Sequence, residues 1–355
     1  MTGRWLLACM LVALWAPHAA AQRAVALEWL GATASIDPLY SYVPIAKEMG
    51  YLTSNGIAID LTVTPMNGIT IPPVVAGRAP IGYGAAEQLI GPAADGQDPG
   101  LAFFFNLNRE PIFNVVVLPQ SAIKTIRDLK GTTVGVQTIV GGPVPYIKGV
   151  FTTLGLDSDK DVEFSAVGVG AGALAELQRN DVQSLVQADT VIAALENLGA
   201  AFRALPQEDY TKVYVTGGLF ARRDFLAQHK DELCTFGRGI AMGLEFLVAN
   251  PEAGVRLYWK YYPEAKPKGV DDATALKQTM HILAARIGKY DPRRQRIDKY
   301  GAYGDDEWQA VVKALGLTAK LPEDRLKLLY TNAFVDCFND FDRAKVDAEA
   351  RAFKM

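Results

Sequence analysis

The sequence predicts an α/β protein built from two similar lobes with a ligand-binding cleft between them. Two stretches of the chain repeat the same order of strand-like runs, and each run leads through a loop rich in Gly, Ser, Thr or Asn into an amphipathic helix. Loops at the carboxyl ends of strands in two such lobes form a cleft, and clefts of this kind bind small molecules. The strand-like runs lie near Ala24, Ala58, Ala79 and Leu101 in the first stretch, and near Thr132, Asp161, Asp181 and Ala201 in the second.

The beginning of the chain has the pattern of an export signal. Arg4 supplies an early positive charge, an apolar stretch from Trp5 to Ala16 follows, and Pro17 precedes the small residues Ala19 to Ala21. The apolar stretch is shorter than the roughly 20 residues that cross a bilayer, so we expect cleavage near Ala21 rather than a retained anchor. This predicts a periplasmic protein.

The composition excludes some classes of protein. The 355 residues carry a formal net charge of -3, which gives no electrostatic case for binding nucleic acid. After export, Cys234 and Cys337 remain, and an oxidising compartment favours their pairing, with two buried thiols as the alternative. No later run is long and apolar enough to span a membrane, so we expect a soluble monomer.

The first lobe is expected to begin with a buried strand, Val25 to Leu30, followed by a loop and a helix that ends at Gly50. Ala58 to Thr64 alternates apolar and polar residues, as a half-buried strand does. Because each connection is long enough for a crossover helix, we expect parallel strands. The later elements of this lobe are a short helix ending at Ala76 to Arg78, a strand at Ile81 to Gly84, another helix, and the strand Leu101 to Phe105, whose phenylalanines we expect in the core.

Two β-rich runs mark the points where the chain is expected to cross between the lobes. Ile112 to Leu118 begins just after Pro111 and predicts the first crossing. Lys212 to Phe220 lacks a helical period and predicts the return. The predicted boundaries are residues 1–21 for the export signal, 22–113 and 216–355 for the first lobe, and 114–215 for the second.

From Arg222 onward the pattern becomes helical, and we expect this tail to pack against the first lobe. The acidic pairs Asp271-Asp272 and Asp305-Asp306 each open a predicted helix, where helix capping and stabilisation of the helix dipole explain them better than paired catalysis. The expected helices run from Asp231 to Val248, from Pro251, from Asp272 to Ile287, from Asp305 to Leu315 and from Pro322 to Tyr330.

Residues for catalysis are scarce. His229 and His281 are the histidines left after export, and each is isolated in a helical stretch, where a surface or packed role is expected. The sequence contains no HExxH, CxxC, GxSxG or GxxxxGK[ST] pattern. Nothing in it requires a metal or an organic cofactor, so we expect neither, and we do not expect an enzyme.

The loops after the strands are more informative. Gln137 to Gly142 follows the first strand of the second lobe and leads into a helix with Pro143 near its start, so its backbone N–H groups can approach an anionic group. The equivalent turn of the first lobe, Thr33 to Tyr40, offers hydroxyls, backbone donors and an aromatic ring. Within it, Asp37 is an alternative as a helix N-cap.

Further strand-to-helix turns point to the same cleft: Met66 to Gly68, Tyr83 to Ala86 and Val169 to Gly172. Asp189 follows a strand and has two interpretations, as the partner of a ligand amine or, more in keeping with its position, as a helix N-cap. Polar groups near the expected cleft mouth are Asn106 and Arg109.

Four stretches resemble one known family, the periplasmic solute-binding proteins of ABC importers in the NMT1/THI5-like, or SsuA-like, group for nitrate, sulfonate, taurine and thiamine pyrimidines. The resemblance covers nearly all of the mature chain. The matching stretches are Pro38 to Leu52 with its GYL ending, AGRAPIGYGAA at Ala76 to Ala86, SAIKTIRDLKGTTVGVQ at Ser121 to Gln137, and LYTNAFV at Leu329 to Val335.

The resemblance implies a type II periplasmic binding fold, in which two α/β lobes, joined by two β crossovers, close on a solute. Relatives often carry a turn rich in Gly-Ser or Ser-Thr where this chain has Thr138 to Gly142, so a small organic anion or a heteroaromatic is expected rather than an inorganic anion. The cysteine-rich motif of the eukaryotic pyrimidine synthases is missing. Carried over by position, the ligand contacts are Ser35, Tyr40, Asn67, Tyr83, Gly84, Gln137, Gly141, Gly142 and Asp189.

The expected function is capture of a sulfonate-like, taurine-like or thiamine-pyrimidine-like solute and its delivery to an ABC permease and ATPase in the inner membrane. Lobe closure would exclude water and place backbone donors on the polar atoms of the solute. Two alternatives remain at this point: a ligand sensor that signals through a membrane partner, and, less in keeping with the scarce catalytic residues, an exported enzyme of the same fold.

Overall fold

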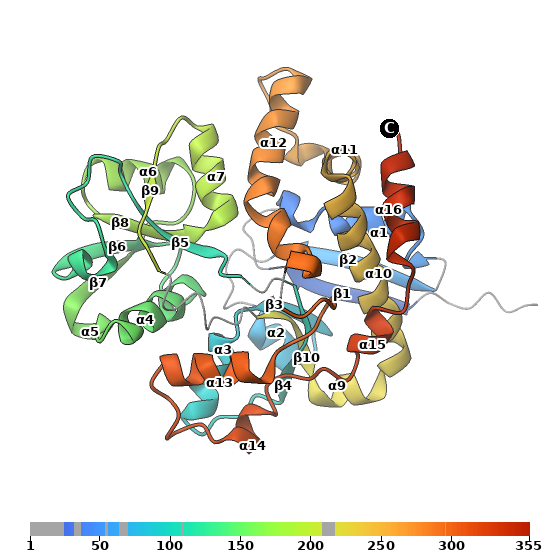
Figure 1. Ribbon diagram of the computed structural model, residues 1–355, viewed down its shortest axis with the longest axis horizontal. Helices are drawn as coiled ribbons and strands as arrows, with labels where there is room; N and C mark the ends of the chain where they lie inside the picture. The colour runs from blue at the N-terminus through green and yellow to red at the C-terminus, as the bar shows by residue number, and fades with distance from the viewer. Residues whose placement is uncertain are drawn as a thin grey trace, which may run out of the picture.

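The computed structural model describes residues 25–31, 37–53, 56–63, 70–107, 110–207, 217–294 and 296–355. These form two mixed β-sheets of five strands, each covered by helices (Figure 1). We call the sheet that contains the first strand of the chain, with its helices, lobe 1, and the other sheet with its helices lobe 2. The predicted export signal, together with Ser35, Asn67 and Arg109, lies outside the described residues.

Lobe 1 has the strand order β2-β1-β3-β10-β4. Strand β1 pairs in parallel with β2 and β3, because the connections between them contain helices that return the chain across the sheet. Strand β10 is antiparallel to both of its neighbours, β3 and β4. The strands are β1 Val25–Gly31, β2 Ile57–Val63, β3 Ile81–Gly84, β4 Leu101–Asn106 and β10 Gly218–Arg222.

Lobe 2 repeats this order with β7-β6-β8-β5-β9. When the strands are numbered within each lobe, both sheets have the same spatial order: second, first, third, crossing and fourth strand. The predicted internal repeat is therefore confirmed. The strands are β5 Phe113–Val117, β6 Thr132–Val136, β7 Val162–Ala166, β8 Ser184–Ala188 and β9 Arg203–Ala204.

The two strands that enter a sheet after the chain crosses between the lobes, β5 and β10, are antiparallel, which the expectation of parallel strands did not include. The chain leaves β4 at its carboxyl end, passes through residues 107–112 and enters lobe 2 as β5, which is antiparallel to β8. A strand that starts at the edge facing the other lobe must run opposite to strands that end there. The same reasoning explains why β10 is antiparallel to β3 in lobe 1.

The helices between strands follow the predicted pattern. Proline stands in the first turn of α2 and α4, where its missing N–H leaves no hydrogen bond unmade. In lobe 1 these helices are α1 Tyr42–Glu48, α2 Ile71–Val75 and α3 Glu87–Ala94, and in lobe 2 they are α4 Pro143–Thr153, α5 Ser158–Asp161, α6 Ala171–Gln178 and α7 Asp189–Asn197.

From Arg223 onward the described chain is helical, as predicted. These helices are α9 Arg223–Gln228, α10 Lys230–Ala249, α11 Pro251–Tyr261, α12 Asp272–Ile287, α13 Asp305–Ala314, α14 Glu323–Leu326, α15 Val335–Phe338 and α16 Arg343–Ala352.

The long helix α10 supports the core of lobe 1. Its buried side chains recur at spacings of three and four residues, from Leu233 through Phe236 and Ile240 to Leu244, and pack among the residues of α1 and β4. Gly243 allows a close approach, since a Cβ there would collide with the carbonyl oxygen of Tyr42. Within the described residues, no helix is both long enough and apolar enough to cross a membrane.

A disulfide joins α10 to α15. Cys234 and Cys337 are bonded with an S–S distance of 2.04 Å, across 103 positions of sequence. Beside it, Phe338 stacks on Phe334 and contacts Phe104 of β4. The disulfide therefore ties the C-terminal helices to the aromatic core of lobe 1.

Both acidic pairs take expected roles at helix starts, one by capping and the other by its charge in the first turn. Asp271 accepts a hydrogen bond from the backbone N–H of Thr274 and caps α12. Helix α13 is capped by Gly304 instead, and Asp305 and Asp306 lie in its first turn, where negative charge is favourable.

Candidate functional site

The site lies where the two lobes face each other. Two contacts between helices join the lobes: α12 of lobe 1 packs along α7 of lobe 2, and α13 and α3 of lobe 1 pack against α4 of lobe 2. The C-terminal tail packs against lobe 1, as expected, and the contacts of α12 and α13 with lobe 2 add to that expectation. Figure 1 shows α12 between α7 of lobe 2 and the helices α10, α11 and α16 of lobe 1.

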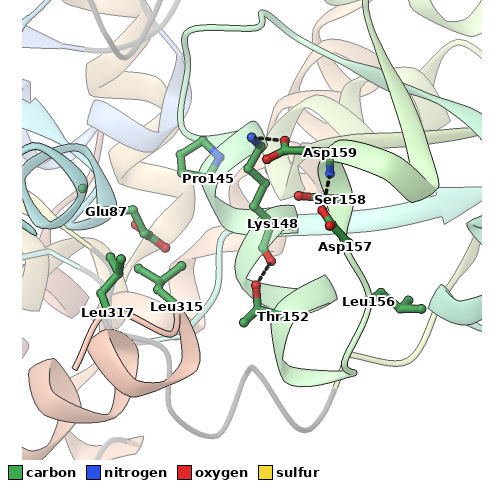
Figure 2. A pocket seen from close by; sticks show the side chains of 11 residues that line it. Glu87, Pro145, Lys148, Thr152, Leu156, Asp157, Ser158, Asp159, Leu315 and Leu317 are labelled. Carbon is green, nitrogen blue, oxygen red and sulfur yellow. Dashed lines mark hydrogen bonds and ion pairs between the residues drawn. The ribbon is translucent and has the colours of Figure 1, made fainter. Parts of the chain in front are cut away.

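A pocket of about 400 Å³ lies on the α4 side of the inter-lobe contact. Figure 2 shows Glu87, Leu315 and Leu317 from lobe 1 on one wall and residues of α4 and α5 on the other. On the lobe 2 wall, Lys148 Nζ lies 2.7 Å from Asp159 Oδ1. The cation of this wall is therefore already paired with a carboxylate of the same lobe.

An ion cluster joins the lobes on the α7 side. The side chain of Asp189, the first residue of α7, accepts two hydrogen bonds of 2.9 Å from Arg286 Nε and one of 2.8 Å from Lys289 Nζ. Arg286 is 2% exposed and Asp189 6% exposed. Burial acts to raise the pKa of Asp189, but the charges of Arg286 and Lys289 outweigh it and hold that pKa below its ordinary value. We call these three residues the inter-lobe ion cluster.

The ion cluster is also fixed to the segment that crosses between the lobes. The backbone N–H of Asp189 donates to the carbonyl oxygen of Ile112 at 2.7 Å. Lys289 Nζ donates to the carbonyl oxygen of Pro111. Both carbonyls lie in the link between β4 and β5, so the ion cluster stands beside the chain segment that joins the lobes.

Tyrosine rings surround Arg286 on its lobe 1 side. The rings of Tyr42 and Tyr290 meet edge to face with centroids 5.8 Å apart, and the hydroxyl of Tyr290 donates to the carbonyl oxygen of Leu39. Tyr83, near the end of β3, is close enough to act on the pKa of Arg286, which burial acts to lower but which is raised well above its ordinary value chiefly by the charge of Asp189. This wall is therefore aromatic, with a polar edge.

Asp37 forms a second contact across the lobes. As predicted, it caps the short 3₁₀ helix η1 Pro38–Tyr40, because its carboxylate accepts a hydrogen bond from the N–H of Leu39 at 2.9 Å. Burial raises the pKa of Asp37 to about 6, although Leu39, Arg286 and a hydrogen bond from Thr190 of α7 act to lower it. This carboxyl group is thus poised to change charge near neutral pH.

The structure places several predicted contacts on the edges of the two sheets that face each other. Tyr83 and Gly84 end β3, Gln137 follows β6, and Gly141 and Gly142 directly precede α4. Gly142 is the N-cap of α4 and leaves its first turn without a side-chain cap, as expected for a helix start that offers backbone donors.

Two predicted contacts also have packing roles. Tyr40 is buried, and a Cβ at Gly31 would lie 2.7 Å from its hydroxyl oxygen. At Gly84, a Cβ would lie 2.9 Å from Gln88 Oε1, which accepts a hydrogen bond from the N–H of Ala85.

The N-cap interpretation of Asp189 is wrong. Helix α7 begins at Asp189, and its N-cap is Ala188, without a side-chain cap. The carboxylate instead binds Arg286 and Lys289, which the strand pattern around Asp189 could not reveal.

Other sequence expectations are resolved in the same region. Phe103 to Phe105 are core residues, as predicted. Asn106 is buried and donates to the carbonyl oxygen of Ala302, so its amide nitrogen is used within lobe 1. His281 lies between the lobes, with Nδ1 2.9 Å from Asn197 Oδ1 and Nε2 3.2 Å from Glu196.

Arg286, Lys289 and Tyr290 were not predicted from the sequence as residues of this site. The sequence contains one local signal for Arg286. The buried face of α12 consists of Ala275, Thr279, Leu283 and Arg286, so a charged residue lies on a face whose other residues are uncharged. A cation on a buried stripe requires a partner, and here the partner comes from the other lobe.

The described ranges contain no group of three or more His, Cys, Asp and Glu side chains that could hold a metal ion. What the arrangement offers is a set of carboxylates, hydroxyls and backbone donors around an aromatic wall. Such a lining suits the recognition of a small molecule.

Comparison with known proteins identifies the family to which this chain belongs. The model of the family described as NMT1/THI5 like matches residues 38–254. A Haemophilus influenzae protein named for thiamine biosynthesis is 24% identical over 286 residues, which cover 76% of this chain and 82% of that protein.

Solved structures show the same fold. A protein of Bordetella bronchiseptica superposes with a TM-score of 0.64 at 20% identity, covering 92% of this chain and 98% of that one. The alkanesulfonate-binding protein SsuA from Xanthomonas axonopodis pv. citri, solved with bound MOPS, gives a TM-score of 0.59 at 16% identity, covering 89% of this chain and 98% of that one.

Proposed function

We propose that this chain, which belongs to the NMT1/THI5-like family, is the periplasmic solute-binding component of an ABC importer. The observation that carries the proposal is the buried ion pair of Asp189 in lobe 2 with Arg286 in lobe 1. Such a contact is made only while the lobes are together, and it stands beside the chain segment that would serve as a hinge. Two lobes that meet through specific contacts around facing strand ends can close on a solute.

The solute is a small organic anion or a heteroaromatic, of the sulfonate, taurine or thiamine-pyrimidine kind. It binds between the lobes and makes contacts on both sides only when they are shut, so binding shifts the population toward the closed form. The closed form delivers the solute to the permease and ATPase. The contacts proposed within the described residues are Tyr40, Tyr83, Gly84, Gln137, Gly141, Gly142 and Asp189.

The rigid bodies of this movement are residues 22–113 with 216–355 and residues 114–215, after removal of the export signal. The protein performs no bond chemistry. In support, the two histidines of the described chain, His229 and His281, are engaged with Glu232 and Glu196 rather than with a nucleophile.

Small-angle scattering of the mature protein tests the proposal. A panel of sulfonates, taurine, aromatic carboxylates and aminopyrimidines is screened first by thermal shift, because a ligand that binds the folded state raises the melting temperature. Ligands that stabilise the protein should also reduce its radius of gyration relative to the ligand-free protein. Stabilisation without contraction would contradict closure, and the absence of any stabilising solute would contradict solute binding.

A further inference from the structure

His281 of α12 contacts lobe 2 through both nitrogen atoms of its ring. Its Nδ1 lies 2.9 Å from Asn197 Oδ1, and its Nε2 lies 3.2 Å from Glu196 Oε2. Both partners stand in the last turn of α7. Because α12 belongs to lobe 1 and α7 to lobe 2, this contact exists only while the lobes are together.

A further hydrogen bond fixes the orientation of the Asn197 amide. Its Nδ2 donates to the carbonyl oxygen of Gln278 at 2.9 Å. Because a carbonyl oxygen can only accept, the atom of the amide that faces His281 is Oδ1. The imidazole ring therefore has an acceptor at each nitrogen, an amide oxygen at Nδ1 and a carboxylate oxygen at Nε2.

Only a protonated ring can donate to both acceptors. A neutral imidazole carries one N–H group, whereas the imidazolium form carries two. A neutral His281 therefore loses one of its two hydrogen bonds to α7 and also loses its attraction to the charge of Glu196. Histidine is the side chain that ordinarily changes charge between about pH 5 and pH 8. The strength of this contact between the lobes thus depends on whether the ring carries its second proton.

The charged groups nearest to the ring come from α7, from α12 and from the residue that follows α12 by two positions. His281 and Glu196 line a surface hollow of about 420 Å³ together with Asp189 and Lys289. Asp189 and Lys289 are bonded to each other, so Glu196 is the carboxylate of the hollow that contacts the ring. On α12 itself, Lys277 lies four positions before His281, where its positive charge opposes that of a protonated ring.

The other elements that pack against α12 are α11 and η1. On α11, Glu252 pairs with Arg256, and Lys260 pairs with Glu48 of α1. At η1 the titratable group is the N-cap Asp37. Burial raises the pKa of Asp37 to about 6, although its hydrogen bonds and Arg286 act to lower it. Asp37 therefore also binds a proton more readily while the lobes are together, which acts in the same direction.

We propose that closure of the lobes takes up a proton at His281, so that acidic conditions favour the closed arrangement and a rise in pH favours opening. The inference rests on the proposed function, because it concerns the same movement of the lobes. In the closed arrangement the protonated ring donates to Asn197 and Glu196, whereas in the open arrangement it faces water. Since the proton is held by two additional contacts in the closed arrangement, its binding stabilises closure by the same factor.

Single-molecule energy transfer between two dyes tests the proposal in the solute-free protein. The dyes are attached to Gln178→Cys in α6 and Ala348→Cys in α16, two exposed positions on opposite sides of the molecule (Figure 1). Cys234 and Cys337 are bonded to each other and take no dye. Small-angle scattering at each pH identifies which of the two populations is the compact, closed one.

We expect the ratio of closed to open wild-type molecules to be higher at about pH 5.5 than at about pH 7.5. This pH step should be about two- to fivefold larger in the wild-type protein than in His281→Ala, as is typical of an exposed ion pair. Asp37 is present in both proteins, so its own response to pH cancels in the comparison. An equal step in the two proteins, an unchanged ratio in the wild type, or opening at about pH 5.5 would each overturn the inference.

His229→Ala is the matched control, because the same substitution there removes a ring that lies 3.7 Å from Glu232 within lobe 1. It should keep the wild-type pH step, and a loss equal to that of His281→Ala would refute a specific role for His281. Glu196→Gln removes the charge that faces the ring and should reduce the step as His281→Ala does. A full wild-type step in Glu196→Gln would contradict the ion pair as its source.

The experiment contains no solute, so its failure is distinguishable from a failure of the proposed function. If the pH step is absent while solutes still stabilise and contract the protein, the coupling to His281 is wrong and solute-driven closure stands. If no solute acts while the pH step is present, the lobes move and the proposed solutes are wrong.

Discussion

Asp189 and Arg286 lie 97 positions apart in the sequence and form a buried ion pair that joins the first residue of α7 to the last turn of α12. The pair connects the two lobes at the point where the chain crosses between them, because the N–H of Asp189 is bonded to Ile112. Since each charge is buried only in the presence of the other, the pair favours the closed arrangement of the lobes only when both members are intact.

Removal of one member should therefore be costly. Arg286→Leu leaves the carboxylate of Asp189 with Lys289 alone, and we expect a loss of about 3–5 kcal/mol in the free energy of unfolding. The double variant Asp189→Leu with Arg286→Leu should recover most of this loss, because the buried carboxylate is removed together with Arg286. Lys289, which loses Asp189 in the double variant, is the more exposed cation and keeps its bond to the carbonyl oxygen of Pro111. Denaturant titration measures both, and equal destabilisation of single and double variants would contradict the coupling.

The exposed side-chain contacts between α7 and α12 should influence closure of the lobes although these side chains do not contact the solute. His281 lies 3.2 Å from Glu196, and Asn197 donates to the carbonyl oxygen of Gln278. We expect His281→Ala to weaken solute binding by about two- to fivefold, since an exposed pair of this kind contributes less than about 1 kcal/mol. Lys160→Ala, which removes the exposed pair with Asp157 within lobe 2, is the control and should bind normally. A His281→Ala protein with unchanged affinity would show that this contact does not bias closure.

Reduction of the disulfide should destabilise lobe 1. The bond between Cys234 and Cys337 closes a loop of 103 positions, and the loss of a native disulfide typically costs about 2–5 kcal/mol. Denaturation with and without reductant measures the difference. The double variant Cys234→Ala with Cys337→Ala should lose this sensitivity to reductant, and a wild-type protein that is equally stable under both conditions would contradict the prediction.

Asp37 should give the protein a measurable pH dependence. Its pKa is raised to about 6 when folded and is about 3.9 in an unfolded chain, so the folded state binds more protons between these values. The stability that this group contributes is therefore complete below about pH 4 and is lost as the pH rises through about 6.

Replacement of this carboxyl group isolates its effect. Relative to Asp37→Asn, which keeps a capping side chain, the wild-type protein should lose on the order of 2 kcal/mol between about pH 4 and pH 7. Denaturant titrations of both proteins at the two pH values measure the difference. If the free energies of unfolding of the two proteins differed by the same amount at both pH values, the pKa of Asp37 in the folded protein would be at its ordinary value.

Local pattern accounts for most of the fold and for little of the site. The alternation in β2 and the turn after β6 are properties of neighbouring residues, and they were predictable for that reason. The cap at Asp37 was predictable on the same basis, whereas Asp189 was assigned a local cap although its partners come from α12 and the residues that follow it.

The sequence by itself determined the two-lobed α/β fold, because the hydrophobic period, the turn residues and the order of the strands depend on residues that are close together in the sequence. Only the tertiary structure decided that β5 and β10 enter the opposite sheets antiparallel, since that follows from which edge each strand starts at. It also decided the charge of the inter-lobe surface. Whether Asp189 can accept an amine from a solute depends on the packing of α12 against α7, which brings Arg286 and Lys289 to the same carboxylate.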